Sequence, residues 1–439
     1  MSHARKGHAG HGRSFVSSLI VRPGPLRHGW FATFTAAVSI GAIADEVARL
    51  ALPLLVLDLT HSIGSAATLR VVQSVPYIVF GAAAGALIDR VDKRRLLIAC
   101  DFASFALTVA IPLSYVGGVF SIELLYVIGF LLGSVEVLWG VTTDFSVVPA
   151  LVEERELTDA NAIYFAADRA ARIVGPALGG VAIAAIGNIS AMWIAALAFL
   201  PTLALFWRMP PAYLASTEQS APLTLGNVAR EIADGFVFVW RLPILRWLLV
   251  VMSIANLGGV GLRTLLLYVL REEQHLDEVS IGLALSVSGG LTIIGSLIAP
   301  RLARGRPMGQ SMIAVCVGAG VGALIAAGSD AWPVVLLGFT VREIAWQAFI
   351  IYAFIPRQRD VPARLRGRAN GAFRTVVLVS NAASPALLSA IVVVSSSAAA
   401  FAAAGAFALA GAGVSFFTPL RRYAVREPAA DDREPGTPV

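Results

Sequence analysis

The sequence predicts an all-α polytopic membrane protein with twelve transmembrane helices in two pseudo-symmetric six-helix halves. Composition, the length of the apolar runs and an internal repeat each predict this class. Of the 439 residues, 57% are hydrophobic and only 14% are charged, whereas soluble domains carry roughly 25% charged residues. In lipid, only helices or a closed barrel satisfy every backbone polar group, and the apolar runs lack the alternation of barrel strands. Helices are therefore expected throughout.

Windows of about 20 apolar residues give the twelve spans and the domain limits. The predicted spans are residues 31–58, 64–88, 96–115, 121–146, 160–186, 190–207, 244–270, 280–300, 309–328, 332–355, 369–394 and 398–419. The expected units are a tail (1–30), an N-terminal half (31–208), a polar linker (209–241), a C-terminal half (242–419) and a second tail (420–439).

An internal repeat relates the two halves. Ala-Asn-Ala at 160–162 recurs as Ala-Asn-Gly at 369–371, and Gly-Pro-Ala-Leu at 175–178 recurs as Ser-Pro-Ala-Leu at 384–387, each 209 residues later. Parallel repeats related by an axis along the membrane normal are typical of rocker-type secondary transporters.

The distribution of basic residues predicts the orientation. If the N-terminus lies inside, Arg271 is the only basic residue in an outside loop, as the positive-inside rule requires. We therefore expect a multi-pass plasma-membrane protein with both termini in the cytoplasm. The formal charge of +6 follows from this distribution and does not indicate a nucleic-acid partner. Arginine outnumbers lysine 32 to 2, which favours a bacterial source.

Ionisable residues at mid-span are the candidates for proton coupling or substrate binding, because charge is costly there. Asp45 and Glu46 share a helix with Arg49, so either acid can pair with it; a neutralised pair and a surplus acid both remain open. Glu136 has no basic neighbour on its own helix, which suggests a proton carrier or a contact to a cationic substrate, unless another span supplies a partner.

The tenth span adds Arg342 and Glu343, which point about 100° apart on a helix and are therefore not expected to pair. Arg263 is expected to extend toward the membrane surface. Asp101 is expected to be structural. The aromatic and amide side chains that could line a cavity for a large amphipathic ligand are Trp139, Asn256, Trp346, Gln347 and Asn381.

Two motifs resemble those of a known family. The turn after the second span, Gly85-x-x-x-Asp89-Arg90-x-x-Lys-Arg94-Arg, resembles motif A of the major facilitator superfamily. On the fifth span, Arg172 precedes a stretch that resembles motif C and contains Gly175, Pro176, Gly179 and Gly180. The resemblance implies the major facilitator fold, with motif A as a latch between the halves. We expect Arg90 or Arg94 of this latch to pair with Asp144 at the inner end of the fourth span, and Asp89 to face the start of the eleventh.

Residues 52–60, 157–162 and 235–243 resemble the drug:proton antiporter branch that holds macrolide exporters, the enterobactin exporter and Tap-type multidrug pumps. The sequence departs from better-known branches because residues 121–146 lack the arginine of motif B. The resemblance implies a secondary active transporter that exports an amphipathic drug, antibiotic, siderophore or metabolite by proton antiport with alternating access. A lipid or lysolipid flippase or a metabolite importer remains an alternative, and a membrane sensor or enzyme a remote one.

The sequence has no G-x-x-x-x-G-K-[ST] phosphate loop, no G-x-S-x-G and no H-E-x-x-H. We therefore expect no enzymatic activity, no cofactor and no metal site, and a proton gradient as the energy source. The expected partners are a small-molecule substrate, protons and membrane lipid, and the expected state is a monomer.

Overall fold

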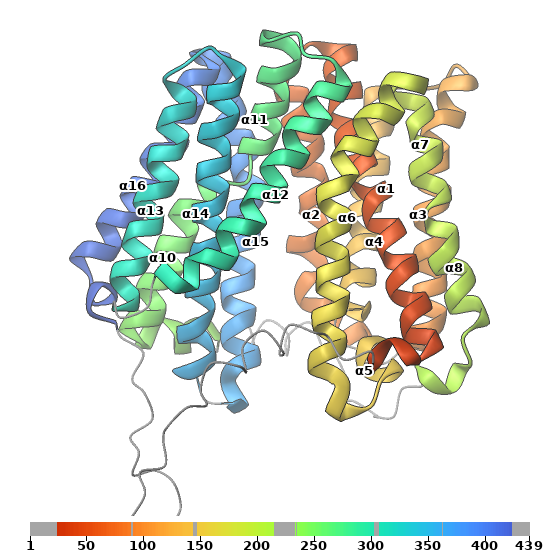
Figure 1. Ribbon diagram of the computed structural model, residues 1–439, viewed down its shortest axis with the longest axis horizontal. Helices are drawn as coiled ribbons and strands as arrows, with labels where there is room; N and C mark the ends of the chain where they lie inside the picture. Colours follow the sequence, from red (N-terminus) through yellow and green to blue (C-terminus); the bar gives the residue numbers. More distant parts are fainter. Residues whose placement is uncertain are drawn as a thin grey trace, which may run out of the picture.

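The computed structural model describes residues 24–88, 91–143, 147–214, 233, 235–302, 307–361 and 363–423. The described residues form helices, turns and short connections, without β-strands. Two groups of helices stand side by side, one from each part of the sequence (Figure 1). The described chain begins and ends at the same end of the bundle, which we call the tail face; the opposite end is the distal face.

The N-terminal group contains α1 (Gly29–Thr60), α2 (Ile63–Ile88), α3 (Lys93–Val116), α4 (Ile122–Thr142), α5 (Val148–Leu151), α6 (Leu157–Ile186), α7 (Asn188–Leu197) and α8 (Phe199–Arg208). The C-terminal group contains α10 (Pro243–Leu257), α11 (Leu262–Tyr268), the π-helical η5 (Val269–Glu273), α12 (Glu278–Leu302), α13 (Met308–Ala327), α14 (Trp332–Arg359), α15 (Ala363–Val394) and α16 (Ser397–Phe417). Short 3-10 helices are η1 (Pro25–Arg27), η3 (Glu154–Glu156), η4 (Pro211–Tyr213) and η6 (Pro419–Arg422).

Eleven of the described helical segments are long and apolar enough to cross a membrane. The first helix, α1, is not among them. It nevertheless has 32 residues, which is about 48 Å of helix, and it runs through the bundle beside the others. Counted with α1, the segments match the twelve predicted spans.

Local signals set several helix ends. The side chains of Asp92, Ser121 and Ser396 accept hydrogen bonds from backbone N–H groups in the first turns of α3, α4 and α16. The predicted seventh span, in contrast, is interrupted between Leu257 and Leu262, where α10 ends and α11 begins. Here a Cβ on Gly261 would lie 2.8 Å from the Cα of Pro385, so this turn depends on close backbone approach.

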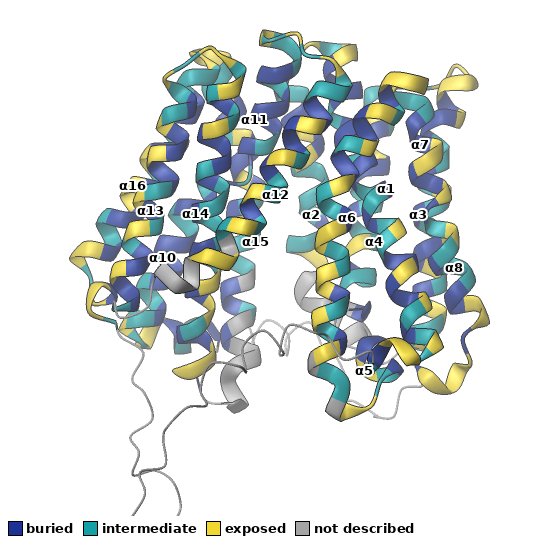
Figure 2. Ribbon diagram, in the orientation of Figure 1, coloured by how far each residue is buried: buried dark blue, intermediate teal, exposed yellow. Residues whose placement is uncertain are grey.

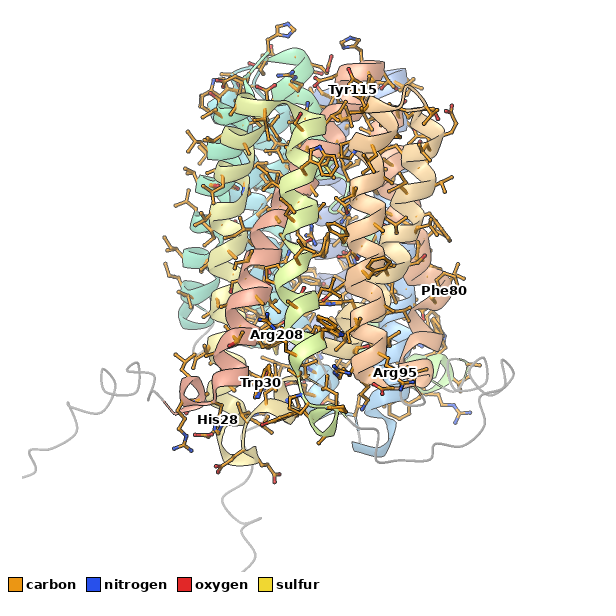
Figure 3. All side chains as sticks on the ribbon, turned by 90° about the vertical axis from the view of Figure 1, so that its right-hand side faces the viewer. His28, Trp30, Phe80, Arg95, Tyr115 and Arg208 are labelled. Atoms are coloured by element: carbon orange, nitrogen blue, oxygen red, sulfur yellow. The ribbon has the colours of Figure 1, made fainter. Side chains whose placement is uncertain are left out.

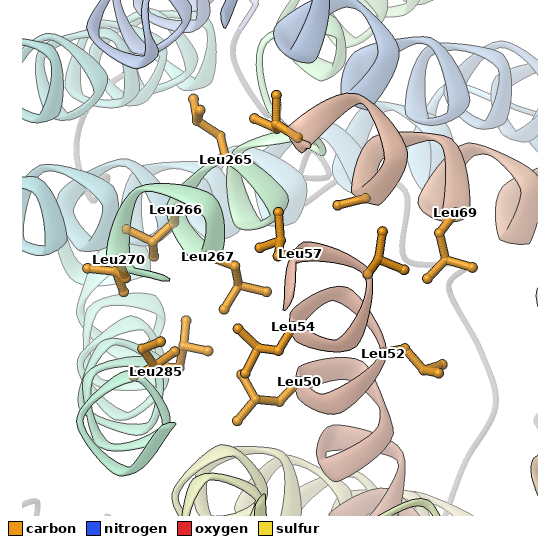
Figure 4. Packing of buried hydrophobic residues seen from close by; sticks show 14 of the residues in the cluster. Leu50, Leu52, Leu54, Leu57, Leu69, Leu265, Leu266, Leu267, Leu270 and Leu285 are labelled. Carbon is orange, nitrogen blue, oxygen red and sulfur yellow. The ribbon is translucent and has the colours of Figure 1, made fainter. Parts of the chain in front are cut away.

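The two groups share a hydrophobic core on the distal side. Leucines of α1 pack against leucines of α11, η5 and α12 (Figure 4). The labelled members are Leu50, Leu52, Leu54, Leu57, Leu69, Leu265, Leu266, Leu267, Leu270 and Leu285. Burial of these side chains closes the distal side, since each contributes about 1.5 to 3 kcal/mol when removed from water.

Contacts between the groups follow the sequence repeat. Helix α6 packs against α12 of the other group, and its repeat partner α15 packs against α2. Both α6 and α15 carry the repeated proline, Pro176 and Pro385. This exchange of equivalent pairs confirms the predicted pseudo-symmetry.

The outer surface is consistent with a lipid environment. Many large apolar side chains are exposed along the helices, including Leu297, Val321 and Phe354 (Figure 2). Figure 3 shows His28 and Arg95 near the tail face and Tyr115 at the distal face. An apolar exposed band of this kind is expected where lipid replaces water.

Candidate functional site

A group of charged side chains lies between the two helix groups. We call it the interhalf cluster; it consists of Asp45, Glu46 and Arg49 of α1, Glu136 of α4, Asp168 and Arg172 of α6, and Arg263 of α11.

Glu46 lies at the centre of this cluster. Its side chain is only 3% exposed, and its carboxylate oxygens lie 2.6 Å from Arg263, 3.5 Å from Arg49 and 3.6 Å from Arg172. A buried carboxylate needs partners of this kind, because a lone charge in an apolar interior costs several kcal/mol. Arg172 also pairs with Asp168, at 3.0 Å.

The glycines of motif C make room for this arrangement. A Cβ on Gly175 would lie 2.5 Å from the Cβ of Glu46, and one on Gly179 would lie 3.2 Å from the Cα of Val47. Helix α6 therefore approaches α1 closely, which brings Arg172 to Glu46. The same helix reaches the other group, where the backbone N–H of Ala177 donates to the hydroxyl of Ser286 at 2.9 Å.

Arg263 joins the helix groups through the cluster. It lies in the first turn of α11, just after the glycine-containing break, and donates from Nη2 to Glu46. The expectation that Arg263 extends toward the membrane surface is therefore wrong. The break in the seventh span directs the side chain inward, where a buried carboxylate offers a stronger interaction than the interface does.

Glu136 has a partner on another span. Its carboxylate lies 3.4 Å from Arg49, and Tyr77 of α2 adds a side-chain hydrogen bond. Its side chain is 54% exposed, so this part of the interface is open to solvent. Asp45 is different: within the described parts of the chain it forms no ion pair, although Arg49 and Arg172 are its electrostatic neighbours. The surplus acid is thus Asp45.

Arg342 and Glu343 pair with each other, which corrects the expectation that adjacent residues would not meet. Both side chains are long and flexible, so they bridge the angular offset between neighbouring positions. The guanidinium of Arg342 also lies 5.2 Å from the ring of Trp346, and its side chain is 6% exposed. The pair is therefore neutralised within the C-terminal group. Arg342 lines a small pocket there with Cys316 and Phe349.

Three of the proposed cavity-lining residues carry a buried polar atom for which the described structure shows no hydrogen-bond partner: Trp139, Asn256 and Asn381. Asn256 lies beside the break in the seventh span and is 3% exposed. Trp346 stacks on Phe349 at 5.3 Å, and Gln347 is half-buried. The structure thus leaves the two amides and the indole of Trp139 with hydrogen-bonding capacity that a ligand or water would satisfy.

Motif A is described only in part. Gly85 lies in α2, whereas Asp89, Arg90 and Asp144 lie outside the described residues. Arg94 donates from Nε to the backbone carbonyl of Phe206, at 2.8 Å, at the end of α8. A cation at this position complements the helix dipole.

Further ion pairs join the two helix groups at the distal face. Arg271 lies 3.0 Å from Asp58 of α1 and 2.9 Å from Glu278 of α12. His61, at the end of α1, contacts Glu272 at 3.0 Å. The only basic residue of the predicted outside loops thus bridges the halves on that side.

At the tail face, His28, Glu153 and Glu156 place their ligand-type atoms within 4.8 Å of one another. Arg27 already pairs with both glutamates, at 3.7 and 3.1 Å, and His28 contacts Glu156 at 2.7 Å. This group is satisfied as an ion-pair network.

Sequence reasoning missed the roles of Arg263 and Tyr77. The positions of both depend on which helices face each other across the interface, and spacing along one helix carries no such information. Only their polar character within predicted spans marked them as unusual.

Comparisons with known proteins agree with this architecture. The sequence profile of the Major Facilitator Superfamily matches residues 29–385. The multidrug efflux pump Tap of Mycobacterium tuberculosis (strain ATCC 25618 / H37Rv) is 29% identical over 350 residues, which cover 76% of this chain and 80% of that protein. The enterobactin exporter EntS of Citrobacter koseri is 25% identical over 395 residues, covering 84% and 86%.

Solved transporter structures share the fold. A bacterial homologue of the iron transporter ferroportin, in its inward-facing state, superposes with a TM-score of 0.69 at 16% identity and covers 88% of this chain and 98% of that one. The nucleoside transporter NupG also has a TM-score of 0.69, at 12% identity, with 87% and 98% covered.

Proposed function

This chain belongs to the Major Facilitator Superfamily, and from that premise we propose that it exports amphipathic small molecules in exchange for protons, by alternating access. The names of two relatives, a multidrug efflux pump and an enterobactin exporter, support export of such compounds over import or lipid flipping. As the positive-inside rule predicts, we place the tail face in the cytoplasm. The described conformation, closed distally, is then the inward-facing one.

The interhalf cluster is the observation that supports coupling. Glu46 holds Arg263 of the other half, so the charge state of this cluster affects how the halves are held together. Asp45 is the acid without an ion-pair partner in the described structure, and we assign the transported proton to it. When Asp45 is protonated, Arg49 and Arg172 remain available to pair with Glu46. When Asp45 is ionised, it competes with Glu46 for both arginines. Loss of the proton thereby changes the contact that joins the halves, which is the differential interaction that coupling requires.

The test compares Asp45→Asn with Glu136→Gln in energised everted vesicles that contain the full chain. We expect Asp45→Asn to abolish proton release on substrate addition and uphill export, while downhill exchange of substrate persists. Glu123→Gln is the matched control, because Glu123 is an exposed acid at the start of α4.

Wild-type proton release and uphill export by Asp45→Asn would remove the proposed role of Asp45. If Glu136→Gln alone loses coupling, the proton belongs to Glu136. A panel of drugs, a siderophore and a lysolipid distinguishes export of soluble amphiphiles from lipid flipping.

A further inference from the structure

Arg70 of α2 is a cation that the interhalf cluster leaves free. Its electrostatic neighbours are Arg49 and Glu136 from its own half and Arg263 from the other half, so it faces the interface between them. The side chain is exposed. Throughout the described part of the chain, it forms neither an ion pair nor a side-chain hydrogen bond.

The two acids closest to Arg70 and Arg263 already have partners, whereas Asp45 lies beside Arg49 and Arg172. Glu46 holds Arg263 at 2.6 Å, and Glu136 is held by Arg49 and by the hydrogen bond from Tyr77. In the described structure Glu136 has one ion-pair partner, Arg49, and Arg70 has none, although Glu136 is among the electrostatic neighbours of Arg70.

The packing of α2 on α4 holds this arrangement in place. A Cβ on Gly133 of α4 would overlap the carbonyl oxygen of Gln73, so the two helices touch at the turn that follows Arg70. Glu136 lies one turn after Gly133, and Tyr77 lies seven residues after Arg70, on the same face of α2. The contact therefore brings Glu136 to Tyr77, at the interface that Arg70 also faces.

We propose that Arg70 binds the carboxylate of an acidic amphipathic substrate. The planar guanidinium fork donates two parallel hydrogen bonds to a carboxylate. Arg70 has no ion-pair partner in the described structure that would compete with such a ligand. This inference rests on the proposed export function and specifies its substrate class.

The test uses two fluorescent probes that differ only in charge, 11-(dansylamino)undecanoic acid and its methyl ester, with the full chain in nanodiscs. Wild type binds the acid about tenfold more tightly than the ester, as expected for a hydrogen-bonded charge. Arg70→Gln binds both probes equally, with its affinity for the ester unchanged, which shows that the variant is folded. Arg70→Lys retains part of the preference. Arg208→Gln, at an exposed position at the end of α8, behaves as wild type.

Retention of the acid preference by Arg70→Gln would overturn the assignment. So would tighter, Arg70-dependent binding of lysophosphatidylglycerol, which would indicate a phosphate headgroup as the ligand. A separate result tests the export hypothesis. If neither neutral drugs nor the acid evoke proton release from wild-type vesicles, the proposed function is wrong. If neutral drugs alone evoke it, export stands and the carboxylate preference falls.

Discussion

Replacing Arg263 by glutamine should weaken the closure of the distal side. The guanidinium of Arg263 donates to Glu46 at 2.6 Å and is the member of the interhalf cluster that comes from the other half. A hydrogen bond to a charged group contributes about 1.5 to 3 kcal/mol. Because the side chain of Arg263 is 40% exposed, solvent screening favours the lower value. A loss of about 1.5 kcal/mol corresponds to a shift of about tenfold in the conformational equilibrium.

The assay is a spin-label distance measurement across the distal face. Nitroxides on Val119→Cys and Asp330→Cys report the separation of the two halves, since both positions are exposed. The background replaces the buried free cysteines, Cys100 and Cys316, by alanine. In Arg263→Gln, the ratio of long-distance to short-distance populations should rise about tenfold.

A charge-conserving variant provides the control. Arg263→Lys keeps the positive charge beside Glu46 and should shift the distances less than Arg263→Gln does. If Arg263→Gln leaves the distance distribution at wild type, the ion pair does not hold the halves together, and the reasoning from its geometry is refuted.

Three further predictions follow from other contacts. Arg271→Gln removes the ion pair with Asp58 that joins the halves at the distal face and should raise the same long-distance population up to severalfold, since such a pair contributes up to about 1 kcal/mol. Unchanged distances would show that this pair does not hold the halves together. Gly133→Ala should lower the melting temperature, because the added Cβ would overlap Gln73. The control is Gly140→Ala on the same helix, where the added Cβ meets open space and the melting temperature should stay at wild type. Equal melting temperatures for the two variants would contradict the close approach of α2 and α4. The hydroxyl and the backbone N–H of Ser280 donate hydrogen bonds to Asp277 and lower the pKa of its carboxyl group. The ionised carboxylate therefore stabilises the folded state above the unfolded-state pKa of about 4. This stabilisation is lost as the pH falls through the folded-state pKa. Asp277→Ala should therefore lower the melting temperature more at pH 7 than at pH 2.5. An equal loss at both pH values would show that the ionised carboxylate is not the cause.

Much of the fold was predictable because lipid imposes simple requirements. Span length, the need to satisfy backbone groups and the repeat at 160–178 and 369–387 predicted twelve helices in two halves, and the structure and the family match confirm this. The break at 258–261 was not predicted. Its glycines lie in a continuous apolar run, and only close contacts with α14, α15 and α16 show why a helix stops there.

By itself, the sequence determined which residues are ionisable at mid-span, because their cost in lipid marks them in any apolar run. It singled out Asp45, Glu46, Arg49 and Glu136, which the structure places in one cluster. Tertiary structure alone decided their partners. Glu46 meets Arg263 across 217 positions of sequence, and in the described part of the chain Glu136 pairs with Arg49 of another helix. Pairing depends on which faces of different helices meet, and periodicity along one helix carries no information about that.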